Sequence, residues 1–165
     1  FYAGRLHDAI VWMPMGTLWT PRNVGTLRRF GGSIQRGWHR GSWTAFARAS
    51  AVYSVNESGF LLPYAAPWSL AASVSRRWAK WEFRADPRLR GATPTAWSLE
   101  STTWLPAQGQ LDLSAIWRGD QSTLALSLIN ATGAPLLLQY GFPLPGRYLN
   151  VAWSRSLTNP KKTKK

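Results

Sequence analysis

The chain has 165 residues, and its 20 lysine and arginine residues against 7 aspartate and glutamate residues give a net charge of +13. It has no cysteine, which excludes disulfides and thiolate metal sites. The length suits one domain, and the charge favours a polyanionic partner, either nucleic acid or an anionic membrane surface. Because it does not begin with methionine and carries no signal peptide, we expect a mature or excised piece of a longer protein.

The 11 tryptophans are as informative as the charge, because tryptophan is enriched where an apolar ring must end near water, as at membrane interfaces. Two uncharged stretches, 58–75 and 121–146, are long enough to span a bilayer as a helix. Both are interrupted by proline, and the second also by glycine. The sequence therefore predicts no transmembrane helix, and a bilayer would have to be crossed by strands.

Alternation of apolar and polar residues predicts an all-β fold, an antiparallel meander of about eight strands. In 43–55, for example, one alternate set is wholly apolar and the other is mostly polar. A helix would instead place apolar residues three and four apart. In chain order, the predicted strands are 4–13, 24–36, 42–55, 67–77, 80–86, 109–118, 122–130 and 146–157. The fifth is the weakest, because Glu82 and Arg84 interrupt it and Pro87 is expected to end it.

The predicted connections alternate in length. Short ones lie at 36–41, 76–80 and 119–121, and long ones at 13–24, 56–67, 86–109 and 130–146. This alternation is typical of outer-membrane barrels, whose long loops face outside. Aromatic residues near the strand ends fit interface girdles: Trp43, Tyr53, Trp68, Trp78, Trp117 and Trp153. A soluble antiparallel sandwich, with its apolar faces packed together, is the alternative that periodicity leaves open.

Segment 130–147 resembles the end of a TonB-dependent outer-membrane receptor. That family ends its penultimate strand with Asn-Leu-Phe and continues, after a loop, with Gly-Tyr-Pro-x-Pro-Gly-Arg. Asn130 matches the first motif, and the second is matched in order by Tyr140, Gly141, Phe142, Pro143, Pro145, Gly146 and Arg147. Weaker matches lie at 9–12 with 21–25 and at 62–64 with 68–70, so the resemblance covers nearly the whole chain and fits the cobalamin and siderophore branch.

The resemblance implies that 1–157 is the C-terminal part of a barrel in the bacterial outer membrane, followed by a disordered basic tail, 158–165. The complete protein would import a metal chelate or cobalamin, energised by TonB through a plug domain not present in this chain. Its partners would be membrane lipid, lipopolysaccharide, the small-molecule chelate and the remaining barrel strands. The chain departs from the family at Ala131 and Thr132, which replace Leu-Phe, and at Arg155 and Leu157, where aromatic residues are expected.

Within the motif, Pro143 and Pro145 stiffen the loop, Gly141 and Gly146 allow tight backbone geometry, and Arg147 can hold loop carbonyls or a lumen carboxylate. We therefore expect the motif to be a structural clamp at the start of the last strand rather than a ligand contact.

We expect no enzyme activity, catalytic residue, cofactor or metal site. His7 and His39 are far apart, and Glu82, Asp86, Glu100 and Asp112 form no recognisable motif. For ligand binding, aromatic and arginine residues of the long loops suit an anionic or ring-bearing chelate. The candidates are Trp19, Arg22, Asn56, Tyr64, Arg88, Arg90, Trp97 and Trp104. For each of them, loop packing or lipopolysaccharide contact is the alternative role.

Basic residues gather at the predicted strand ends and turns: Arg28, Arg29, Arg36, Arg40, Arg76, Arg77 and Lys80. In a barrel they would face the lumen or the periplasmic headgroups. In a soluble basic β-protein they would follow nucleic-acid phosphates beside stacking rings such as Trp38 and Trp43. The barrel interpretation makes nucleic acid an unlikely partner, and a third hypothesis is a degenerate receptor remnant kept as a scaffold.

Overall fold

A computed structural model of the chain describes residues 1–15, 18–96, 104–139 and 141–156. All regular secondary structure in these ranges is β-strand. The described residues include no helix that is long and apolar enough to cross a membrane. The expected basic tail, 158–165, lies outside the described residues, as does Leu157.

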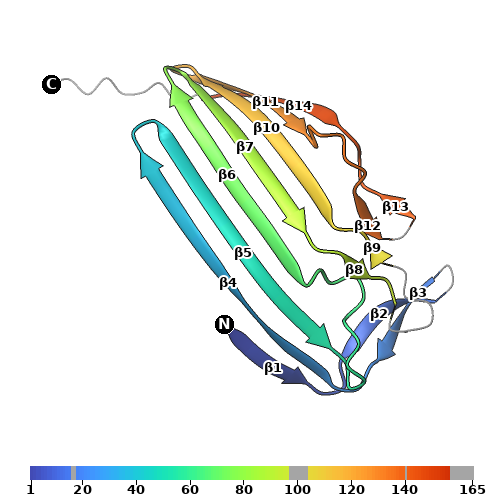
Figure 1. Cartoon of the computed structure of the whole chain (residues 1–165). Helices are drawn as coiled ribbons and strands as arrows, with labels where there is room; N and C mark the ends of the chain where they lie inside the picture. Colours follow the sequence, from blue (N-terminus) through green and yellow to red (C-terminus); the bar gives the residue numbers. More distant parts are fainter. Residues whose placement is uncertain (16–17, 97–103, 140, 157–165) are drawn as a thin grey trace.

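Eight strands form one antiparallel meander, which confirms the predicted fold class (Figure 1). In sheet order these are β1 (Tyr2–Leu6), β4 (Leu27–Arg40), β5 (Trp43–Val55), β6 (Trp68–Trp78), β7 (Trp81–Arg90), β10 (Gln108–Arg118), β11 (Ser122–Ile129) and β14 (Tyr148–Arg155). Sequence neighbours pair throughout, and β1 and β14 form the two edges of the sheet in the described part of the chain.

Three small hairpins lie at one end of this sheet (Figure 1). They pair β2 (Ile10–Met15) with β3 (Leu18–Asn23), β8 (Thr93–Pro94) with β9 (Trp104–Leu105), and β12 (Leu137–Gln139) with β13 (Phe142–Pro143). The prediction of one strand over 4–13 followed by a loop to residue 24 was wrong. The strand breaks at 7–9, where Asp8 has a φ of 51°. Residues 10–23 then form the β2–β3 hairpin in place of the expected loop.

The fifth predicted strand does not end at Pro87 but continues to Arg90. Proline removes one backbone N–H, so a central strand is an unfavourable place for it. Pairing with β10 runs unbroken through Leu111 opposite Pro87, whereas pairing with β6 skips from Arg88 to Ala85. The ladder is interrupted on the β6 side alone, so β7 stays in the sheet.

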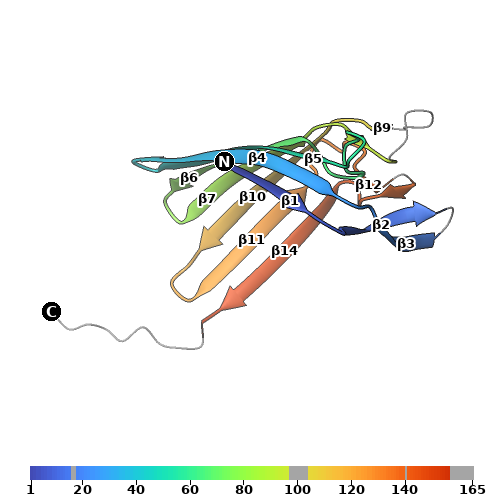
Figure 2. The ribbon, with the colours of Figure 1, turned by 90° about the horizontal axis from the view of Figure 1, so that it is seen from below.

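The sheet curls across its width (Figure 2). Its two faces differ chemically. Residues that are cross-strand partners lie on the same face, so the register assigns each side chain. One face, here called the apolar face, carries bulky apolar residues on every strand from β4 to β14, including Ile34, Trp68, Leu89, Leu113 and Trp153. The other, the polar face, carries most of the charged and hydroxyl side chains of β6, β7 and β10.

The apolar face remains exposed in this chain. Ile34, Trp78 and Trp153 are 74%, 69% and 65% exposed, and the buried apolar residues among those described are Leu27, Leu105 and Leu136. A soluble sandwich would bury this face against a second sheet, but no second layer covers it in the described residues. The fold therefore resembles part of a barrel wall with an exposed apolar face.

The two ends of the sheet differ. Turns at Gly41–Ser42, Ala79–Lys80 and 119–121 close one end, here called the short-turn end, and long connections with the small hairpins occupy the other, the loop end. Tryptophans of the apolar face cluster near the short turns: Trp38, Trp43, Trp78, Trp81, Trp117 and Trp153. Such a girdle is typical of a barrel strand that leaves the bilayer.

A charge placed on either side of β11 tests this assignment of faces. Leu126 lies on the apolar face and its neighbour Ala125 on the polar face. In lipid vesicles, we expect Leu126→Arg to lower the free energy of unfolding by about 2–4 kcal/mol, the cost of arginine at a lipid-facing position near the midplane. Urea titration measures the change. Ala125→Arg is the matched control, and an equal loss for both variants would contradict the assignment.

Candidate functional site on the polar face and at the loop end

Strand β7 carries a ladder of charged side chains on the polar face. Because alternate residues of a strand share a face, Glu82, Arg84, Asp86, Arg88 and Arg90 all project to the same side. Three carboxylates that form no recognisable motif in the sequence, Glu82, Asp86 and Asp112, therefore share one face, and each is paired with arginine. The fourth, Glu100, lies outside the described residues.

Near the short-turn end, Glu82 is held between two arginines. Its Oε2 accepts hydrogen bonds from Arg77 Nε at 3.3 Å and Arg118 Nη1 at 2.9 Å. Glu82 is only 8% exposed, and a buried carboxylate without a partner would be strongly destabilising. The pair of guanidinium groups compensates the buried charge and ties β6, β7 and β10 together.

Halfway along the ladder, Asp112 joins the sheet to the loop that follows β11. Its Oδ1 accepts hydrogen bonds from the Asn130 backbone N–H at 2.9 Å and from Gln110 Nε2 at 2.8 Å. Its Oδ2 lies 3.5 Å from Arg88 Nη2. Beside it, Arg84 Nε donates to Asp86 Oδ1 at 3.1 Å and to Ser73 Oγ at 2.9 Å.

At the loop end of the ladder, Arg90 and Gln108 hold the β12 hairpin. The two side chains are joined by an Arg90 Nη2 to Gln108 Oε1 hydrogen bond of 2.9 Å. Both also donate to the Leu137 carbonyl, and Gln108 Oε1 accepts from the Leu137 N–H at 2.8 Å. The side-chain amide of Gln108 thus pairs with the backbone of Leu137 as a neighbouring strand would, and it anchors the β11–β14 connection on the sheet.

Asn130 is the centre of the motif that the sequence singled out. It is 1% exposed, has a φ of 51°, and donates from Nδ2 to the Ala134 carbonyl at 2.9 Å. Asparagine tolerates this left-handed conformation better than most residues, and its side chain completes the turn. These contacts place Asn130 inside the turn that follows β11.

The rest of the motif behaves less uniformly. Pro143 lies in β13, Gly141 has a φ of 79°, and Pro145 and Gly146 are exposed in the segment before β14; Tyr140 lies outside the described residues. Among the described residues, Arg147 makes no hydrogen bond or ion pair. Its guanidinium instead lies against Gly133, where an added Cβ would be 2.9 Å from Nη2. We expected Arg147 to bond a loop carbonyl or a carboxylate. In the structure, Asn130 bonds the Ala134 carbonyl, and Gln108 and Arg90 bond the Leu137 carbonyl.

The structure brings two of the ligand candidates together at the loop end. The rings of Trp19, on β3, and Tyr64, in the β5–β6 connection, have centroids 5.6 Å apart. The Tyr64 N–H donates to the Pro94 carbonyl at 2.8 Å, which joins β8 to the same cluster. Aromatic rings at this separation stabilise each other, so three separate loops meet at this pair.

Among the remaining candidates, Trp104 pairs on β9 with Pro94, the residue whose carbonyl accepts from Tyr64. Arg88 and Arg90 were predicted to be loop residues, but they lie on β7 and face the polar side, because β7 continues past Pro87. Arg22 on β3 and Trp104 on β9 are exposed, and Asn56 accepts a hydrogen bond from the Phe60 N–H in a turn. Trp97 lies outside the described residues. Sequence reasoning missed Gln108 and Asp112, although both continue the alternation of polar residues on β10.

A further link at the loop end joins the β5–β6 connection to the start of β4. The Thr26 N–H donates to Glu57 Oε1 at 3.3 Å. The hydrogen bonds from Thr26 favour the ionised carboxylate and lower the pKa of Glu57 below its ordinary value. No cluster of three or more potential metal ligands occurs within the described ranges.

The chain is similar in structure to outer-membrane receptors. The FrpB iron transporter from Neisseria meningitidis matches with a TM-score of 0.69 and 16% identity, over 92% of this chain and 27% of the transporter. The copper transporter OprC matches with a TM-score of 0.71 and 18% identity, over 92% of this chain and 26% of OprC. The pyoverdine outer membrane receptor FpvA from Pseudomonas aeruginosa matches with a TM-score of 0.70 and 11% identity, over 90% and 25%.

These matches confirm the fold that the resemblance implied, that of part of a TonB-dependent receptor barrel. The chain spans about a quarter of the length of the structures it matches. No protein-family model matches the sequence, and no curated protein matches it.

Removal of the Asp112 carboxylate tests the coupling between the ladder and the loop. Asp112→Ala leaves the Asn130 N–H and Arg88 without their acceptor, and we expect a loss of about 1–3 kcal/mol in stability. Amide hydrogen exchange in 130–139 should accelerate. Asp86→Ala, which removes a carboxylate bonded only to Arg84 in the described structure, is the control. Equal exchange in the two variants would show that Asp112 does not anchor the loop.

Proposed function

We propose that the chain forms part of the wall and outer loops of a bacterial outer-membrane receptor that imports a metal chelate with energy from TonB. The observation that carries this proposal is the inverted arrangement of the sheet. Its bulky apolar residues are exposed and bounded by tryptophans on one face, while the carboxylates of β7 and β10 are paired with arginines on the opposite face. A barrel in lipid needs both features.

The pairing of charge also argues against the soluble alternative. Nucleic-acid binding depends on arginine and lysine side chains that are free to contact phosphates. On the polar face of β6, β7 and β10, four arginines are bonded to carboxylates: Arg77, Arg84, Arg88 and Arg118. The apolar face, in turn, would be exposed to water in a soluble protein of this shape, which is unfavourable for a surface of this extent.

The edges of the sheet support a larger assembly. A strand edge in lipid leaves N–H and C=O groups without partners, so a membrane barrel must be closed. Since β1 and β14 have one neighbour each in the described structure, further strands are required on both sides. They would be the remaining barrel strands that the resemblance implies.

The loop end suits recognition of an anionic, ring-bearing chelate. Trp19 and Tyr64 provide aromatic surface where three loops meet. Arg88, which is ion-paired with Asp112, and Arg90 add basic side chains on the polar face at the loop end of β7. Iron, copper and pyoverdine are named for the matched proteins. A ferric siderophore is therefore a better-supported ligand than cobalamin.

Membrane fractionation is the first test of the proposed function. We expect the native protein in the outer-membrane fraction, with a gel mobility in detergent that shifts on boiling, because a closed barrel resists unfolding by detergent until heated. A soluble protein that elutes with nucleic acid in a salt-dependent manner would overturn the proposal and support the nucleic-acid alternative.

Substitution of the aromatic pair tests the ligand site. We expect Trp19→Ala to weaken binding of a ferric catecholate or ferric pyoverdine-type chelate by roughly tenfold, the scale of one aromatic contact. Equilibrium fluorescence quenching of the full-length protein in detergent measures the affinity. Trp78→Ala removes an exposed tryptophan at the short-turn end and should bind as the parent does. Unchanged binding by Trp19→Ala would remove this pair from the site.

A further inference from the structure

The apolar face carries a group of arginines that the receptor function does not use. Arg40, Trp43 and Arg76 are cross-strand neighbours on β4, β5 and β6, in one row of the sheet. Arg36 and Trp38 lie on the same face of β4, at alternate positions before Arg40. These five residues are here called the arginine–tryptophan patch. They lie at or within a few residues of the turns at Gly41–Ser42 and Ala79–Lys80, at the short-turn end.

The positive charge of this patch is uncompensated within the described structure. Arg36, Arg40 and Arg76 are exposed and form no ion pair with any described residue. The Arg76 guanidinium lies 5.2 Å from the centroid of the Trp43 ring, a cation–π contact that positions the charge without neutralising it. The register places no described carboxylate on this face of β4 to β7. An anion from outside the chain is therefore the missing partner.

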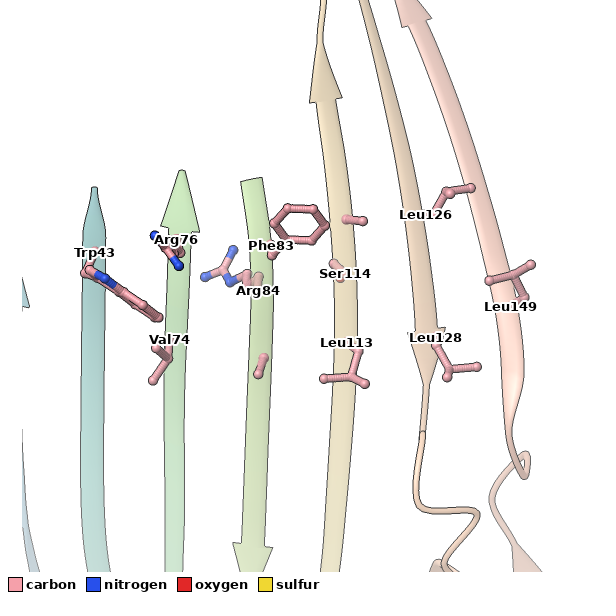
Figure 3. Close-up of a pocket in the computed structure, with 12 residues that line it drawn as sticks. Trp43, Val74, Arg76, Phe83, Arg84, Leu113, Ser114, Leu126, Leu128 and Leu149 are labelled. Carbon is pink, nitrogen blue, oxygen red and sulfur yellow. The ribbon is translucent and has the colours of Figure 1, made fainter. Parts of the chain in front are cut away.

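Two apolar hollows adjoin the patch, and one arginine of the patch lines each of them. The first is bounded by Trp43 and Arg76 and continues across β7, β10 and β11 over Ala85, Leu113 and Leu128 (Figure 3). In Figure 3, Arg76 and Trp43 lie at one margin of this hollow, with leucines farther along.

Arg36 lines the second hollow, and small residues form its base. It is lined on the apolar face by Ile34, Arg36, Ala47, Ala49, Leu70, Ala72, Pro87 and Leu89. The alanines of β5 and β6 leave a depression between the larger side chains. A flexible hydrocarbon chain fits such a surface, whereas a rigid, hydrated polymer does not.

We propose that the arginine–tryptophan patch binds the headgroup of an anionic phospholipid, whose acyl chains occupy the two hollows. The charge complements a phosphodiester, and each hollow continues from an arginine toward the middle of the sheet. Arginine on a lipid-facing surface is tolerated near the interface and is costly at the midplane, which agrees with the position of all three near the short turns. In the proposed orientation, this end faces the periplasmic side, where phospholipid is available.

Lipid retention measured by native mass spectrometry tests this proposal. The full-length protein is mixed in detergent with equal amounts of phosphatidylglycerol and phosphatidylethanolamine. Attraction of basic side chains to anionic lipid predicts roughly tenfold enrichment of phosphatidylglycerol. In the variant Arg36→Gln/Arg40→Gln/Arg76→Gln, the ratio should fall close to one.

The matched control removes three charges at the other end of the sheet. Arg5→Gln/Arg28→Gln/Arg29→Gln changes exposed arginines of β1 and β4 at the loop end and should retain the enrichment. The proposal is overturned if the parent shows no preference, or if both triple variants lose it equally, since that would reflect net charge alone. Displacement of phosphatidylglycerol by a short RNA at equal phosphate concentration would also overturn it, in favour of a nucleic-acid surface.

A second variant keeps the test independent of charge. Ala49→Leu/Ala72→Leu fills the second hollow while leaving every arginine in place. Both side chains project from the apolar face, so larger apolar residues should not disturb the sheet. We expect fewer retained phosphatidylglycerol molecules, with the boiling-dependent gel shift unchanged. Unaltered retention would show that the acyl chains do not lie in this hollow.

Discussion

A backbone that crosses lipid must find a hydrogen-bond partner for every N–H and C=O group, because no water is present to supply one. The antiparallel ladder from β1 to β14 meets this requirement over most of its inner strands, apart from the interruption at Pro87 and the part of β4 beyond the end of β1. The other features of the molecule depend on this ladder. Side chains alternate along each strand, which assigns every side chain to one face of the sheet. The short turns close one end of the sheet, and the long loops occupy the other.

The polar face shows how charges are accommodated on such a wall. Glu82 and Asp112 are buried; two arginines compensate Glu82, and Arg88 with the Asn130 N–H and Gln110 compensates Asp112. Asp112 also bonds the backbone of Asn130, and Gln108 and Arg90 bond that of Leu137. The ladder of β7 and β10 is therefore also the anchor of the β11–β14 connection at the loop end.

The predictions from the sequence agree with the structure where the local residue pattern decides the conformation. They differ where pairing between strands decides it. The whole of β5 follows from alternation, whereas the short connections predicted at 36–41 and 76–80 are tighter than expected, because β4 continues to Arg40 and β6 to Trp78. Pro87 was misjudged, because the cost of a proline depends on which neighbour its missing N–H would have faced. Residues 10–15 and 18–23 were assigned to a strand end and a loop, since the break at Asp8 is a backbone conformation with little trace in the pattern.

The candidate site shows the same difference between local residue pattern and pairing across the sheet. Asn130 and Trp19 were found from a motif and from residue type, but the partners that give them a role, Asp112 and Tyr64, are distant in the sequence. By itself, the sequence determined the eight strands of the main sheet and its two faces, because alternation is a local property, and the motif in 130–147 carried the resemblance to a receptor barrel. Only the tertiary structure decided which charges pair, which loops meet and which arginines face outward, because cross-strand register brings together residues whose spacing along the chain carries no signal.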